Sequence, residues 1–199
     1  LRQALGRGPD LAIDIDPTTI AGTVDPTFTT SIGVPGAANE SKVFVYEILP
    51  ASDGLFIGGA MSKVNGIGRS KAAKIGFDGT LVKPWKVTGV NGAVRDMALA
   101  ADAQTVFIAG AFNKLNGITH QSIARVSAAT GADDPWTVSG VIVGDINHPG
   151  MTCWSIAVTA TRLFAGCGRG PNYAAAFRLD NGNTGNLSCH LKQQLFALF

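Results

Sequence analysis

Three cysteines, Cys153, Cys167 and Cys189, lie in the last quarter of the sequence and are its first candidates for covalent chemistry. Two apolar stretches between Cys153 and Cys167 are predicted to form a hairpin. A register that places Ala157 opposite Leu163 also places Cys153 opposite Cys167, at a Cα separation of roughly 4.5–5.5 Å that a disulfide can span. The alternative is that both are small buried thiols. The odd count leaves Cys189 free or paired with a residue beyond this sequence.

Metal binding finds little support in the residue spacing. Zinc sites need Cys or His in close pairs such as C-x-x-C, and the sequence has no such pair. Asp14 and Asp16 would share one face of a strand, where they either bind Ca²⁺ or are simply solvated. Asp133 and Asp134 precede a proline, where aspartate commonly stabilises a turn through local hydrogen bonds. The sequence therefore predicts no metal site and no cofactor.

Nucleophilic catalysis is not predicted either, because the sequence has no G-x-S-x-G motif. His120 occupies the loop position that Arg69 holds in the preceding copy of a repeat, which indicates a surface site tolerant of substitution. Paired carboxylates for glycoside hydrolysis remain an open alternative, because they can come from separate parts of a fold. We therefore predict no catalytic residue from motifs alone.

The elements that position these residues come from that repeat. The stretch 56–66 recurs at 107–117, and a shorter copy begins at Leu163. Both full copies end in Asn-Gly, the strongest signal for a two-residue hairpin turn. Short apolar runs separated by Gly, Asn and Asp, without a helical period, predict an all-β fold. Four antiparallel strands in every 50 or so residues match one blade of a β-propeller.

The predicted architecture is a β-propeller, or a segment of one, built from four-stranded antiparallel blades. Small residues in the second strand of each blade fit a crowded position, and the closing Pro84-Trp85 and Pro135-Trp136 are expected to pack between neighbouring blades. A closed four-blade ring and a piece of a larger propeller both remain open. The predicted units are a partial blade at 1–28, full blades at 40–86, 92–137 and 150–190, and a closing strand at 191–199.

Composition limits the partners. Charged residues make up 15% of the chain and the formal net charge is +2, so a nucleic-acid partner is not predicted. No apolar run approaches the roughly 18–20 residues that a membrane-spanning helix needs, so membrane insertion is not predicted. The first residue is Leu1, and we expect that upstream sequence precedes it. The N-terminus therefore leaves export undecided.

The repeated phrase resembles a known family. Residues 106–112, Asn116-Gly117, 123–126 and Pro135-Trp136 are similar to the delta-60 repeat, a β-propeller repeat frequent in large secreted or cell-surface bacterial proteins. The resemblance extends over most of residues 5–190. It implies a propeller fold and an extracellular or cell-surface location, and it carries no catalytic residue with it.

Two loops depart from the repeat and are the predicted places for a ligand. These are 33–42 and 141–150, and the second contains the polar candidates Asp145, Asn147 and His148. We predict a non-catalytic binding or structural module that recognises a protein or a glycan, or further copies of the same propeller. The alternative is a secreted hydrolase or glycan-processing enzyme with carboxylates at the channel mouth.

Overall fold

The structure is a computed structural model, and it describes residues 25–33, 43–138, 152–168 and 172–182. Within these ranges the regular secondary structure is entirely β, as the sequence predicts. The predicted closing strand at 191–199 lies outside the described residues. The strands are β1 (Ile32–Gly33), β2 (Val45–Ala51), β3 (Gly54–Gly59), β4 (Lys63–Val64), β5 (Ile67–Gly68), β6 (Ala72–Ile75), β7 (Val94–Leu99), β8 (Thr105–Gly110), β9 (Lys114–Leu115), β10 (Ile118–Thr119), β11 (Ile123–Ser127), β12 (Thr152–Val158), β13 (Arg162–Gly168) and β14 (Asn172–Arg178).

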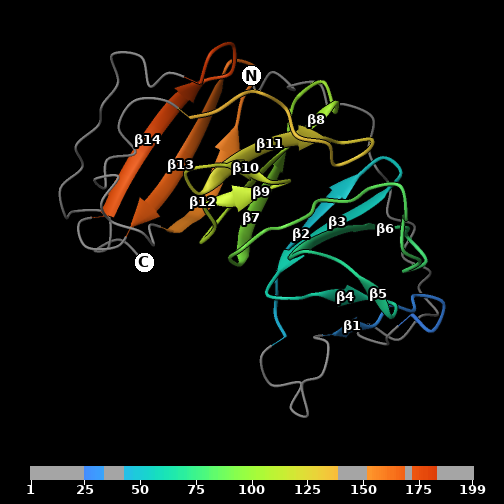
Figure 1. Cartoon of the computed structure of the whole chain (residues 1–199). Coiled ribbons are helices and arrows are strands. Elements are labelled where there is room, and N and C mark those ends of the chain that lie inside the picture. The colour runs from blue at the N-terminus through green and yellow to red at the C-terminus, as the bar shows by residue number, and fades with distance from the viewer. Residues whose placement is uncertain (1–24, 34–42, 139–151, 169–171, 183–199) are drawn as a thin grey trace, which may run out of the picture.

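Three antiparallel sheets of the same design follow one another along the chain and in space (Figure 1). The first sheet is β2-β3-β6, the second is β7-β8-β11 and the third is β12-β13-β14. In each, the second strand is central and pairs with the other two. The first and second sheets also carry small hairpins, β4–β5 and β9–β10, and β1 pairs with β4.

The predicted Asn-Gly hairpin turns are confirmed. Asn65 and Asn116 have φ of 49° and 51°, and the glycines after them have φ of 76° and 82°, as a two-residue hairpin requires. The asparagine side chains do more than tolerate this backbone. The Asn116 Oδ1 accepts the backbone N–H of Thr88 at 2.7 Å, and its Nδ2 donates to the carbonyl of Gly131 at 2.9 Å. Each turn therefore ties one repeat to the closing segment of the repeat before it.

The predicted fourth strand is wrong as a full strand in the repeats at 40–86 and 92–137, and in the repeat at 150–190 it lies outside the described residues. After the third strand the chain forms only single bridges, Ile75 with Leu81 and Val126 with Asp133. The reason is the proline that follows: Pro84 and Pro135 have no N–H to donate to a ladder. The chain then turns inward and buries Trp85 and Trp136, so the segment serves packing between sheets instead of pairing.

The predicted disulfide between Cys153 and Cys167 is present, with a Cα separation of 3.9 Å, closer than predicted. The predicted register of its hairpin is wrong by one residue, because Ala157 pairs with Phe164 and not with Leu163. A β-bulge between Cys153 and Ser155 inserts the extra residue that restores the cysteine pair.

The core lies between the sheets. Phe56 of the first sheet is buried with Val94 and Val106 of the second sheet, and Trp85 lies edge-on to Phe56 with ring centroids 5.2 Å apart. The Trp85 Nε1 donates to the carbonyl of Ser127 at 3.1 Å, which bonds the first repeat to the second. The Trp136 ring has the matching place between the second and third sheets. This confirms the expectation that the tryptophans pack between neighbouring units.

Candidate functional site

The first strands of the three sheets lie together. The middle one, β7, contacts β2 on one side and β12 on the other. Each of these strands has a β-bulge near its start, and the extra residues are Tyr46, Arg95 and Trp154. A bulge redirects a side chain that regular pleating would place on a sheet face. The three sheets thereby bring one side chain each to a common point.

The three bulge residues form a stack, which we call the axial stack. The guanidinium carbon of Arg95 lies 4.1 Å from the ring centroid of Tyr46 and 4.7 Å from that of Trp154. Phe44 extends the stack, with its ring 5.7 Å from that of Tyr46 and nearly parallel to it. A cation between two aromatic faces is stabilised by about 0.5–2 kcal/mol per contact. The stack thus joins three sheets that share no backbone ladder.

The aromatic rings of the axial stack are open to solvent. Trp154 is 55% exposed and Phe44 is 49% exposed, whereas the other two tryptophans are buried. Exposed aromatic groups gathered with a cation are typical of binding surfaces, because they offer flat apolar area beside hydrogen-bond donors. The disulfide at Cys153 holds the strand directly before Trp154. The surface is therefore rigidly supported.

Two carboxylates follow the bulges. Burial, and then the charge of Asp96, raise the pKa of Glu47 above its ordinary value. Asp96 itself is fully engaged: its Oδ2 accepts the N–H of Ile156 at 2.6 Å and its Oδ1 accepts the N–H of Met97 at 2.8 Å. The first of these bonds crosses from the second sheet to the third. Asp96 therefore holds two first strands at a fixed spacing.

The predicted ligand residues Asp145, Asn147 and His148 lie outside the described residues. They belong to the stretch that leads into β12, whose bulge residue is Trp154. The other predicted insertion, 33–42, leads in the same way toward Tyr46. In the sequence, both predicted loops thus precede the first strands that carry Tyr46 and Trp154.

The interpretation of His120 as a tolerant surface position is wrong. His120 and Arg69 are buried, with 2% and 6% exposure. The His120 Nε2 lies 3.0 Å from the Asp133 Oδ1, and the Arg69 guanidinium donates to the carbonyl of Lys83 at 3.1 Å. Burial raises the pKa of Asp133, and the neighbouring imidazole opposes this. Both residues anchor the small hairpin beneath the chain that closes its repeat, so these two side chains are buried although the hairpin residues next to them are exposed.

The stretches the structure describes contain no group of three or more His, Cys, Asp or Glu residues arranged to hold a metal ion. Nor does any helix suited to crossing a membrane occur in the described ranges. No protein-family model, no curated protein and no solved structure matches the chain. The geometry of the site therefore has to carry the functional argument by itself.

Sequence reasoning missed the axial stack because its members have no fixed spacing. Tyr46 and Trp154 each lie ten residues before the phenylalanine in the second strand of their own sheet, whereas Arg95 lies twelve residues before the corresponding phenylalanine. The difference comes from a longer turn in the second sheet, at 100–104. The one signal in the sequence was positional, since each of the three residues directly follows an apolar residue near the start of a first strand.

Proposed function

We propose that this chain is part of a β-propeller and acts outside the cell as a non-catalytic recognition module. The sheets would be blades, with their first strands around a common axis and the axial stack at one mouth of the channel. Three features support this arrangement. The sheets follow each other in chain order, and β7 lies between β2 and β12. The ring of each closing tryptophan also donates a hydrogen bond to the next sheet. The resemblance to the delta-60 repeat supports it as well.

The ligand would be a protein or a glycan bound at the axial stack and the adjoining loops. The observation that carries this proposal is the exposed, disulfide-supported Trp154 ring beside Arg95. An indole face stacks on the apolar face of a sugar ring or on an aromatic side chain, while a guanidinium donates to nearby oxygens. The disulfide also supports an extracellular or cell-surface location, since such bonds persist in oxidising compartments.

An array of cell-surface glycans and extracellular peptides tests the proposal. We expect the wild-type protein to bind one class of probe and Trp154→Ala to lose at least tenfold in affinity. Phe77→Ala is the matched control, because Phe77 is 61% exposed but lies on a turn of the first sheet instead of in the stack. Equal loss in both variants, or none in either, would refute recognition at the stack.

A glycan-processing hydrolase is the second candidate, and Glu47 is the observation that favours it. A carboxyl group with a raised pKa is suited to donate a proton at neutral pH. Asp96 is a poor partner for it, because both its oxygens hold backbone N–H groups. Release of reducing sugar from any arrayed glycan, abolished by Glu47→Gln, would establish this candidate in place of pure binding.

A further inference from the structure

Three cations in the described residues lie over aromatic rings, and two of them also hold a carboxylate. Arg125 lies over the ring of Trp136, and its Nη2 donates to the Asp134 Oδ1 at 2.6 Å. Lys74 lies over a phenylalanine ring, and its Nζ is 2.7 Å from the Asp53 Oδ1. In both cases a ring covers one side of the cation and an acidic oxygen accepts from its N–H groups.

The third cation is Arg95, and no carboxylate of the described residues pairs with it. The rings of Tyr46 and Trp154 lie against its guanidinium in the axial stack. None of the ion pairs in the described residues includes Arg95. Of its nitrogens, only Nε is both enclosed and unpaired. Because the donors of a guanidinium radiate in its plane, the terminal N–H groups point toward the rim of the stack.

The two carboxylates that follow the bulges are engaged elsewhere. The Asp96 oxygens accept the backbone N–H groups of Met97 and Ile156. Glu47 is half-buried, and burial, with the charge of Asp96 adding to it, raises the pKa of this carboxyl group. Neither residue forms an ion pair with Arg95. The terminal N–H groups of Arg95 are therefore available to an acceptor from outside these residues.

A sugar acid matches both parts of the stack. A sugar ring has a flat C–H face that can lie on the indole of Trp154, which is 55% exposed. A planar carboxylate can accept two parallel N–H bonds from the guanidinium of Arg95. An acidic peptide side chain supplies the carboxylate without a flat ring beside it. A chain of uronate units supplies both groups in every unit.

We propose that the axial stack binds an acidic glycan, whose uronate carboxylate pairs with Arg95 as Asp134 pairs with Arg125. This inference rests on the proposed recognition function and names the class of ligand for it. The ring that carries the carboxylate, or its neighbour in the glycan chain, stacks on Trp154. The pairing of ring, guanidinium and carboxylate at Trp136 is the same interaction formed within the protein.

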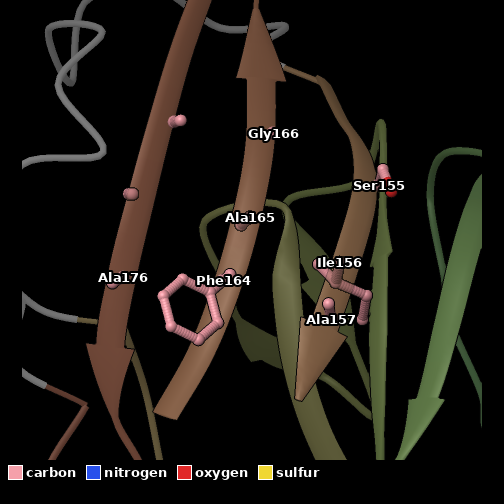
Figure 2. A pocket seen from close by; sticks show the side chains of 9 residues that line it. Ser155, Ile156, Ala157, Phe164, Ala165, Gly166 and Ala176 are labelled. Atoms are coloured by element: carbon pink, nitrogen blue, oxygen red, sulfur yellow. The ribbon is translucent and has the colours of Figure 1, made fainter. Parts of the chain in front are cut away.

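A hollow on the third sheet lacks this chemistry and provides a control. Phe164 and small or aliphatic residues border it, and Ser155 is the one residue with a polar side chain among those that line it (Figure 2). Since none of these lining residues is charged, a carboxylate gains no ion pair there. Phe164 is 42% exposed. Its ring is therefore an accessible aromatic group outside the axial stack.

Isothermal titration calorimetry with matched sugars tests the inference. The probes are oligomers of galacturonate, mannuronate and glucuronate, each as the free acid and as the methyl ester, which keeps the ring and removes the charge. We expect wild-type protein to bind at least one acid about tenfold more tightly than its ester. Arg95→Gln should reduce the affinity for the acid to that for the ester and leave the ester affinity unchanged. Trp154→Ala should weaken the binding of both forms.

Two matched variants control for general effects. Lys114→Gln removes the same charge from an exposed position outside the stack, and Phe164→Ala removes an exposed ring outside it. Both should bind the acid like wild type. Equal losses in Arg95→Gln and Lys114→Gln would reveal a general attraction of anions and would overturn the inference. Equal losses of acid and ester in Arg95→Gln would also overturn it, because Arg95 would then only shape the stack.

The remaining outcomes separate this inference from the proposed function. Binding of a neutral glycan or a peptide that depends on Trp154, with no preference for acid over ester, would overturn the acidic ligand and leave recognition at the stack intact. Binding of a polyglutamate peptide, but of no acidic sugar, would have the same meaning. Absence of any binding that depends on Trp154 would overturn both.

Discussion

Replacing Gly58 with alanine tests how closely the first and second sheets approach. The new methyl group would lie 2.6 Å from the Val94 Cγ1 and 3.1 Å from the Met97 Sδ. Val94 is completely buried, so it cannot turn away without displacing the core between the sheets. Overpacking of this kind costs about 1–3 kcal/mol.

An effect on the unfolded chain offsets part of this loss of stability. Replacing glycine with alanine restricts the unfolded chain and stabilises the folded protein by about 0.4–1 kcal/mol. The expected net decrease in the free energy of unfolding for Gly58→Ala is therefore about 1–2 kcal/mol. For a chain of this length that corresponds to a midpoint lower by roughly 2–8 °C.

Urea denaturation followed by tryptophan fluorescence measures the effect, because the buried Trp85 ring lies at this interface. Gly68→Ala is the control, since a Cβ at Gly68 meets no atom within 4 Å. Truncating the collision partner in the double variant Gly58→Ala, Val94→Ala should cost less than the two single losses added together. A Gly58→Ala protein as stable as wild type, or strictly additive losses, would refute the described packing of the two sheets.

Three further results are expected. The double variant Cys153→Ser, Cys167→Ser should lower the free energy of unfolding by about 2 kcal/mol, which is low for a disulfide because the closed loop is short. The intact mass of the wild-type protein should rise by about 2 Da on reduction. An unchanged mass would exclude the bond. Trp136→Phe should lower the free energy of unfolding in urea by about 1 kcal/mol, because the hydrogen bond to the Arg178 carbonyl is lost. An unchanged free energy of unfolding would show that the Trp136 ring does not make this bond. Because the pKa of Glu47 is raised in the folded state, its protonated form stabilises the protein fully below the ordinary value of 4.5, and this stability is lost as pH rises through the folded pKa. Glu47→Gln should therefore be more stable than wild type near pH 7, and this difference should disappear in acid. Urea denaturation of both proteins at several pH values measures the difference. The reverse trend would contradict the burial of this carboxyl group.

Residues close together in the sequence determined most of the local structure. Apolar runs defined the strands. The Asn65-Gly66 and Asn116-Gly117 pairs defined the turns, because Asn and Gly tolerate the positive φ that a two-residue hairpin turn requires. The disulfide was predictable for a similar reason: both cysteines lie in one hairpin, so only a short register had to be right. It survived a register error because a bulge compensated for it.

Apart from the packing of the closing tryptophans, contacts beyond a single hairpin had no such local signal. Pro84 ends the predicted fourth strand, and burial of the following tryptophan decides where the segment goes. Arg69 and His120 look like loop residues, yet each fills a buried site whose partner lies about 13 or 14 residues further along the chain. Because both side chains are polar, the sequence predicted that they are exposed, whereas the structure buries them.

The sequence by itself indicated a β-rich chain of repeated hairpins and made Cys153 and Cys167 a candidate disulfide pair. Only the tertiary structure decided that Tyr46, Arg95 and Trp154 meet. It also decided that the Asp96 carboxylate bonds the first strand of the second sheet to that of the third. A bulge changes which way one side chain points without altering the apolar pattern around it. Three such changes in three separate sheets become a surface only when the sheets are packed together, and that packing is set by side chains far from the surface itself.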